Sequence, residues 1–408
     1  MSFRKLSLSS LANVGGQVVA AISAFLVSPV LIHNLGEADY GLWLLAFSII
    51  GYLELLDLGM TGTAVRFFSN SIGTDNQSRL AALFLAFRKF YRYSGAAIAL
   101  LGLLCAVIGW LLPEYRETQR TLFLTMAPVG LLLGLTFACR VYASLLRARL
   151  LYHHLSLINI GRLVVFTAAV MTVGSELDLP RLVAIYATLV ILEQLGIFLL
   201  GKPHVPSEQI TPMTREEWKP VFAHASKNVV GRIAESLRWR TDKQVIAGFV
   251  SLPAVTQYGV GVRIPTLFFS LLTALFGSQF IAAFSQMAES RSLEERREFL
   301  KMTLQICAAF SYSGGLILFF LTPSFIELWL GPGFDEAKKI ALILLPPWAI
   351  LGALSPLNCF LISVGKHGRV ASMSISGAII NLVLSLVLVN YLGLHGVVVA
   401  TAIEFTLI

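Results

Sequence analysis

Charged residues are scarce in this chain. Of its 408 residues only 13% are Asp, Glu, Lys or Arg, whereas 56% are hydrophobic and the mean hydropathy is +0.76. Soluble domains carry about 25% charged residues. The composition therefore excludes an ordinary soluble domain and predicts an all-α protein that crosses a membrane several times.

The motifs of common enzymes are also missing. The sequence has no P-loop, HExxH or GxSxG motif and no paired-acid motif for glycosyl transfer. Its four cysteines lie in apolar stretches without metal-ligand spacing, which indicates small core residues rather than disulfides or a metal site. The net charge of +8 is what a membrane protein acquires through basic cytoplasmic loops. We therefore expect no enzyme, no cofactor and no nucleic-acid partner.

Apolar runs long enough to span a bilayer recur along the whole length. Lys and Arg gather in the loops on one side of these runs, which predicts a cytoplasmic N-terminus. The predicted spans cover residues 8–32, 41–60, 93–112, 121–145, 155–174, 182–201, 262–284, 303–322, 340–363 and 370–390, with an unfinished run from 397.

An internal repeat relates the two halves of the chain. Tyr-Gly at 40–41 recurs at 258–259, and Tyr-Ser-Gly at 93–95 recurs at 312–314. Such near-constant offsets predict two parallel-repeat bundles of six transmembrane helices, with the twelfth helix incomplete. The predicted domains are an N-terminal lobe at 1–201, a cytoplasmic connector at 202–225 and a C-terminal lobe at 226–408.

The repeat places a highly charged stretch in the seventh span, near residues 227–250. It is either a solvated helix at the cytoplasmic end or a helix that lines a polar cavity, because charge in lipid is costly. Its charged and polar residues share one helical face, and the i,i+4 spacing of Arg238 and Asp242 suggests an internal pair. We predict that five cations bind substrate, namely Arg232, Arg238, Arg240, Lys243 and Arg263. The predicted polar lining of the cavity is Asn13, Gln17, Glu235, Trp239 and Asp242.

Acidic residues in the first half allow two interpretations. Glu54 and Asp57 lie one turn apart on the second predicted span, and Glu193 lies on the sixth. Carboxylates within a membrane can couple transport to Na⁺ or H⁺. The alternative is a structural ion pair with Arg66, Arg140 or Arg162.

Short motifs in both halves carry a family resemblance. The first half has Asn13, Pro29, Leu35-Gly36 with Tyr40-Gly41, and Leu58-Gly59 followed by Ala64 and Arg66; the second has Asp242, Gly248-Phe249, Tyr258-Gly259 and Arg263. The chain thereby resembles the polysaccharide flippases of the Wzx type, in the superfamily that includes multidrug (MATE) exporters and lipid II flippases.

This resemblance implies a MATE-like fold and a flippase of the bacterial plasma membrane. It implies transfer of a polyprenyl-pyrophosphate-linked oligosaccharide between leaflets by alternating access, for cell-surface polysaccharide biosynthesis such as that of O-antigen. The expected partners are this lipid-linked oligosaccharide, membrane lipids and other polysaccharide assembly proteins. The five cations would hold the pyrophosphate, and Asn13, Gln17 and Trp239 would line the sugar path. The alternatives are a drug or metabolite exporter of the same fold and a membrane glycosyltransferase or polymerase.

Overall fold

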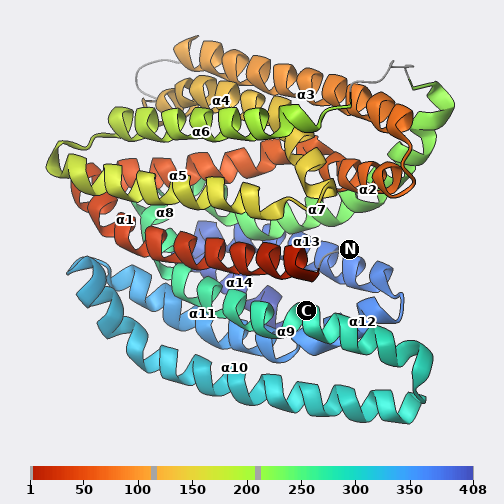
Figure 1. Cartoon of the computed structure of the whole chain (residues 1–408). Coiled ribbons are helices and arrows are strands. Elements are labelled where there is room, and N and C mark those ends of the chain that lie inside the picture. The colour runs from red at the N-terminus through yellow and green to blue at the C-terminus, as the bar shows by residue number, and fades with distance from the viewer. Residues whose placement is uncertain (1–2, 112–116, 207–212, 408) are drawn as a thin grey trace. The chain divides into compact units, whose positions relative to one another are not determined.

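The fold is described from a computed structural model, shown in Figure 1. The structure describes residues 3–111, 117–206 and 213–407. Within these ranges the side chains of several short stretches, including 3–14, 230–232 and 234–235, lie outside the description.

Helices make up the described ranges, and no strand occurs in them. The first half contains α1 (Phe3–Leu53), α2 (Met60–Gly73), α3 (Gln77–Leu111), α4 (Glu117–Ala148), α5 (Tyr152–Val173) and α6 (Leu179–Gly201). The second half contains α7 (Arg215–Phe249), α8 (Leu252–Gly261), α9 (Arg263–Ser290), α10 (Leu293–Leu330), α11 (Asp335–Ala353), α12 (Ser355–Ser363), α13 (His367–Leu392) and α14 (Leu394–Leu407). The all-α prediction is confirmed.

Nine helical segments of the described residues are long and apolar enough to cross a membrane. The chain is therefore a multi-pass membrane protein. Helix α7 is not among the nine, because its charges exceed what such a span tolerates. The four cysteines form no disulfide among the described residues, and two of them, Cys307 and Cys359, are buried.

Helix α1 joins the first two predicted spans. Its 51 residues bend at Gly36, whose φ of 76° lies in the left-handed region that glycine adopts without strain. The predicted break between residues 32 and 41 is thus a kink rather than a loop. Similarly, α3 and α10 each unite a charged amphipathic stretch with the apolar span that follows it, since no glycine or proline separates the two parts.

The order of elements repeats along the chain. Helices α3, α4, α5 and α6 begin at residues 77, 117, 152 and 179, and α10, α11, α13 and α14 begin at 293, 335, 367 and 394. Helices α5 and α13 also end at matching glycines, Gly174 and Gly393, which share a φ of 55°. These near-equal intervals agree with the duplication inferred from the tripeptides.

The chain divides into two compact units. The first unit comprises Met1–Gly36 and Ile49–Arg232, and the second comprises Glu37–Ser48 and Ile233–Ile408. The predicted boundaries at residues 201 and 226 stay a prediction. Helix α7 already begins at Arg215, within the predicted connector, and crosses from the first unit into the second.

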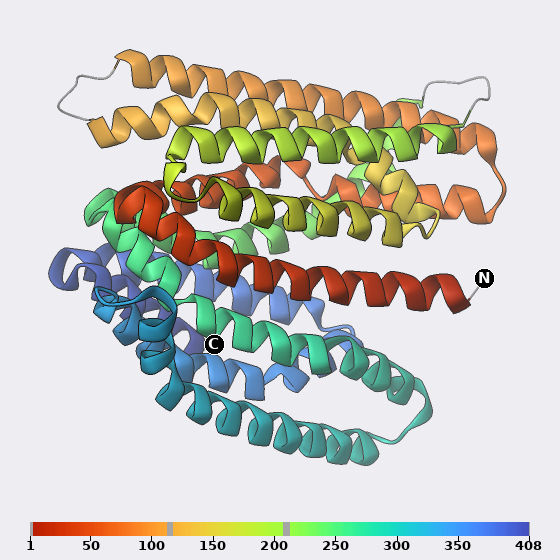
Figure 2. The same ribbon diagram turned by 60° about the vertical axis from the view of Figure 1, so that its left-hand side comes forward.

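The first unit is built around a close pair of helices. Helices α3 and α4 lie side by side in Figures 1 and 2. At two levels glycines face each other across this pair, Gly95 with Gly134 and Gly102 with Gly130, and a Cβ on any of them would collide with the opposite backbone. Small residues of this kind let membrane helices approach closely. Aromatic side chains, including Phe68, Phe87, Tyr91 and Phe137, fill the core beside the pair.

The second unit has its own apolar core. Trp348 of α11 and Phe405 of α14 are almost fully buried there, with Tyr258 of α8. The α1 segment Glu37–Ser48 belongs to this unit. Gly41 has no side chain, which allows the backbone to pass against the carbonyl of Leu252.

Candidate functional site

Helix α7 carries the charged stretch, which is therefore helical rather than a loop. A capping box formed by Thr214 and Glu217 starts this helix, because the Glu217 carboxylate accepts hydrogen bonds from the backbone N–H and the hydroxyl of Thr214. These bonds lower the pKa of the Glu217 carboxyl. Three predicted cavity residues, Asn13, Arg232 and Glu235, have side chains that lie outside the described residues.

Arg238 forms an ion pair with Glu404 of α14. The distance between Arg238 Nε and Glu404 Oε1 is 2.5 Å, and the Glu404 side chain is completely buried. The guanidinium also lies 4.8 Å from the centre of the Phe405 ring. Trp239 stacks near Trp348 and Phe405, with ring centroids 5.1 and 5.6 Å away. The charge of Arg238 is thus neutralised inside the protein.

The predicted pairing of Arg238 with Asp242 is wrong. Asp242 is buried and accepts hydrogen bonds from the hydroxyls of Tyr258 and Thr401, the latter at 2.9 Å. Helical spacing identifies neighbours on the same helix, but α8 and α14 supply closer partners for Asp242. These contacts make Asp242 the junction of three helices.

Several oxygen atoms near this junction have no hydrogen-bond partner among the described residues. They include Asp242 Oδ1, Asn381 Oδ1 and Ser385 Oγ, all buried, and the two carboxylate oxygens of Glu404 likewise accept no hydrogen bond from a described residue. Asn381 donates a hydrogen bond of 3.1 Å to Thr401, and Ser385 lies one turn further along α13. Buried oxygens cost free energy when unsatisfied, and oxygen-rich sites suit hard cations. The donor set therefore fits a small cation such as Na⁺.

Two arginines of the second unit contact its α1 segment. Arg240 Nη1 donates to the Phe47 carbonyl at 3.4 Å, and its own carbonyl accepts a 2.8 Å hydrogen bond from Ser48. Arg263, at the start of α9, lies 3.5 Å from the Tyr40 hydroxyl. These contacts, to a backbone carbonyl and to a tyrosine hydroxyl, help to hold the two side chains in place.

Lys243 lies in the electrostatic field of Arg240, Arg263 and Asp242. It is half-buried, and it has no ion pair or hydrogen bond among the described residues. Asp242 is the acid that interacts with Lys243, and Glu404 is engaged by Arg238. The structure thus brings together three of the five predicted substrate-binding cations.

Glu54 and Asp57, which the sequence suggests for ion coupling, both contact Arg140. Asp57 is completely buried, lies 3.3 Å from Arg140 and accepts a 2.6 Å hydrogen bond from Thr61. Glu54 lies 3.3 Å from the same guanidinium, which stands 3.9 Å from the Phe137 ring centroid. These contacts agree with the structural alternative, while ion coupling by Glu54 and Asp57 stays a prediction.

Glu193 lies apart from this group and pairs with Arg162 at 3.0 Å. Gln17, predicted to line the sugar path, is exposed and lines a cavity of the first unit with Arg147 and Asn159. The predicted carboxylates for ion coupling thus have arginine partners, whereas Asp242 Oδ1, in the second unit, has no hydrogen-bond partner among the described residues.

Sequence reasoning missed Asn381, Ser385 and Thr401, and it recognised Glu404 as an acid within a span without assigning it to the site. Each is a polar residue within an apolar helix, and Asn381 and Ser385 have the i,i+4 spacing that places them on one face. Polar residues within membrane helices are costly and usually functional. This spacing is the signal that could have found them.

No family model and no curated protein matches the sequence. Solved structures do match the fold over nearly the whole chain. A multidrug resistance MATE family transporter of the MOP superfamily, in an inward-facing conformation, has a TM-score of 0.71 at 13% identity, covering 94% of this chain and 91% of that one. The lipid II flippase MurJ, in an inward closed conformation, has a TM-score of 0.70 at 13% identity, covering 98% and 85%.

A MOP superfamily transporter from Pyrococcus furiosus, described by the reverse polarity of its binding pocket, has a TM-score of 0.67 at 12% identity and covers 99% and 92%. These identities establish the fold alone. The chain therefore has the MATE-like fold of these transporters and flippases.

Proposed function

We propose that this protein is a flippase. It moves a polyprenyl-pyrophosphate-linked oligosaccharide from the inner to the outer leaflet of a bacterial plasma membrane, by alternating access. The observation that carries the proposal is the group of three cations in the second unit, Arg240, Lys243 and Arg263, of which Lys243 has no partner among the described residues. The likeness to a lipid II flippase supports it.

The three cations suit a pyrophosphate. Guanidinium groups form paired, charge-assisted hydrogen bonds with phosphate oxygens, and a lysine adds a compact charge. Arg238 has its own acid in Glu404. We therefore propose that Arg240, Lys243 and Arg263 bind the pyrophosphate without Arg238. Arg232 stays a predicted member of the set, since its side chain lies outside the described residues.

The exposed part of the Trp239 ring offers a surface for a sugar. Its indole is 39% exposed and is held in place by Trp348 and Phe405. A fixed aromatic ring presents an apolar face with little loss of conformational entropy. Trp239, with Asn13 and Gln17, remains our assignment for the sugar path.

Coupling to a cation is the second part of the proposal. The oxygens of Asp242, Asn381, Ser385 and Thr401 would hold Na⁺ inside the second unit. We prefer them to Glu54, Asp57 and Glu193, whose charges are balanced by arginines. The N-terminus would be cytoplasmic, and other polysaccharide assembly proteins would deliver and remove the substrate.

A drug or metabolite exporter is the alternative function. The buried carboxylates Asp242 and Glu404 favour it, since acidic sites suit cationic compounds, and MATE family multidrug transporters share the fold. The two functions differ in substrate charge. Removing the positive charge of Lys243 should raise the transport activity of a cation exporter, whereas it should lower the transport activity of a pyrophosphate flippase.

Complementation tests the proposal. In a flippase-null strain that expresses the chain, Lys243→Gln with Arg263→Gln should reduce surface polysaccharide at least ~10-fold, because two cations that face the pyrophosphate are lost. Lys338→Gln is the matched control, since Lys338 is paired with Glu327 and Asp335 away from these cations. Full complementation by the double variant at equal expression would overturn the proposal, and resistance to cationic drugs would favour the alternative.

A further inference from the structure

A cavity of about 330 Å³ lies within the first unit. Its polar lining consists of Gln17 from α1, Arg147 from α4, and Tyr152, Ser156 and Asn159 from α5. Small-molecule sites in proteins have volumes of about 300–1,000 Å³. The cavity is therefore large enough for a small polar ligand.

Arg147 is the charged group of this cavity. It is half-buried and has no ion pair or hydrogen bond among the described residues. The acid that interacts with it is Asp57, which Arg140 already holds. By contrast, Arg149 two residues later donates to the His204 carbonyl at 3.2 Å. A partly desolvated guanidinium without an acid favours an anionic ligand.

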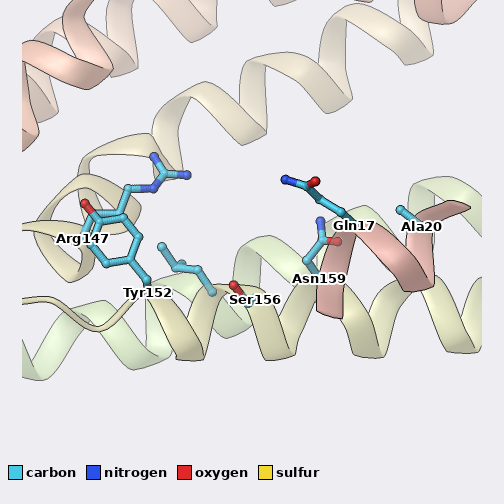
Figure 3. Close-up of a pocket in the computed structure, with 8 residues that line it drawn as sticks. Gln17, Ala20, Arg147, Tyr152, Ser156 and Asn159 are labelled. Atoms are coloured by element: carbon cyan, nitrogen blue, oxygen red, sulfur yellow. The ribbon is translucent and has the colours of Figure 1, made fainter. Parts of the chain in front are cut away.

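Neutral polar groups surround the same space. Figure 3 shows the guanidinium of Arg147 and the amide of Gln17 extending toward it from opposite sides, with Asn159 next to Gln17 and Ser156 between Asn159 and Arg147. Amides and hydroxyls both donate and accept hydrogen bonds, as a row of sugar hydroxyls requires. The half-exposed ring of Tyr152 adds an apolar face beside the cation.

We infer that this cavity binds an acidic sugar, a hexose unit that carries a carboxylate or phosphate group. The anionic group pairs with Arg147, and the hydroxyls bond to Gln17, Asn159 and Ser156. A neutral sugar would leave the guanidinium unpaired. A bare phosphate would accept hydrogen bonds but would bring no row of hydroxyl donors for the amide carbonyl oxygens of Gln17 and Asn159. The inference rests on the proposed function and adds to it that the transported glycan carries a charged sugar, separate from the pyrophosphate held in the second unit.

Binding to the purified full-length chain in detergent tests the inference. The method is saturation-transfer NMR, which detects the millimolar dissociation constants expected of single sugars. The ligands compared are glucuronate, glucose 1-phosphate, glucose and inorganic phosphate. Glucuronate and glucose 1-phosphate should bind at least ~10-fold more tightly than glucose and than inorganic phosphate. Only these two ligands carry both an anionic group for Arg147 and sugar hydroxyls for the neutral polar side chains. Equal binding of glucose or of inorganic phosphate, or no binding of either acidic sugar, would overturn the inference.

Variants link any binding to the cavity. Arg147→Gln should lower the affinity for glucuronate at least ~10-fold, while the matched variant Arg149→Gln should leave this affinity unchanged. If Arg147→Gln does not fold, Gln17→Leu serves instead, since Gln17 is exposed, and it should weaken glucuronate by about 3- to 10-fold. Unchanged affinity in the folded cavity variant contradicts the inference.

Lipid headgroups and the pyrophosphate carrier are the competing anions. In nanodiscs of phosphatidylglycerol, glucuronate should still bind; if this lipid displaces it completely, the anion of the cavity is a lipid headgroup and the inference fails. Binding of undecaprenyl pyrophosphate that depends on Lys243, without any glucuronate binding, would overturn this inference and leave the proposed function standing.

Discussion

Thr401 on α14 donates a hydrogen bond of 2.9 Å to Asp242 on α7. The two residues are far apart in sequence, and Tyr258 on α8 donates to the same carboxylate oxygen. Asn381 on α13 reaches Thr401 in turn. Four helices of the second unit therefore meet at one buried acid, beside oxygens that have no partner among the described residues.

The first prediction concerns a cation at this junction. Replacing choline chloride by NaCl should raise the melting temperature of the purified chain, because a ligand that binds only the folded state stabilises it. Asp242→Asn should abolish this rise, whereas Asp335→Asn, which changes an exposed acid of α11, should retain it. A sodium-dependent rise that survives in Asp242→Asn would contradict the assignment.

The second prediction concerns the pair of Arg238 and Glu404. Glu404→Gln should lower the free energy of unfolding by about 3–5 kcal/mol, because it leaves a buried guanidinium without its acid. The double variant Arg238→Met with Glu404→Leu should recover most of the loss, since neither charge is then buried. SDS-induced unfolding in mixed micelles measures both values, and equal losses in the single and double variants would refute the pairing.

A third prediction separates the two interpretations of Asp57. If its contact with Arg140 is structural, Arg140→Met alone should destabilise the first unit by about 3–5 kcal/mol, because the buried carboxylate of Asp57 then has no positively charged partner at Arg140. Arg140→Met combined with Asp57→Asn should then fold and transport nearly as well as the wild type. Loss of sodium-dependent transport in that folded double variant would instead support ion coupling by Asp57.

A fourth prediction concerns the close contact of α3 and α4. Gly102→Ala should destabilise the first unit by about 1–3 kcal/mol, because the new methyl group would meet the backbone of Met126 and Gly130. Gly62→Ala is the matched control, since open space surrounds Gly62. Equal melting temperatures of the two variants would show that α3 and α4 do not pack so closely.

Much of the fold is readable in the sequence. Apolar runs and tripeptide spacing predict the helices and their duplication, because both depend on local composition and periodicity. The sequence predicts a loop where Gly36 forms a kink, since glycine is common in both.

The candidate site is harder to predict from the sequence than the fold, because its side-chain contacts depend on which helices pack against one another. Charge and helical periodicity identify Arg240, Lys243 and Arg263 as candidates, but they cannot show that Glu404 neutralises Arg238. Similarly, Asp57 and Glu193 are visible as acids within apolar spans, whereas their arginine partners come from other helices. Partners distant in sequence determine whether a charge is available to a ligand.

The most direct measurement of the central claim is flipping of a lipid-linked substrate in proteoliposomes. A fluorescent oligosaccharide linked to undecaprenyl pyrophosphate is placed in both leaflets, and its accessibility to an impermeant quencher is followed over time. Wild-type protein should speed the exchange between leaflets, and Lys243→Gln with Arg263→Gln should slow it at least ~10-fold while Lys338→Gln does not. Flipping at the wild-type rate by the double variant, or none by the wild type with its ion gradient in place, would contradict the account.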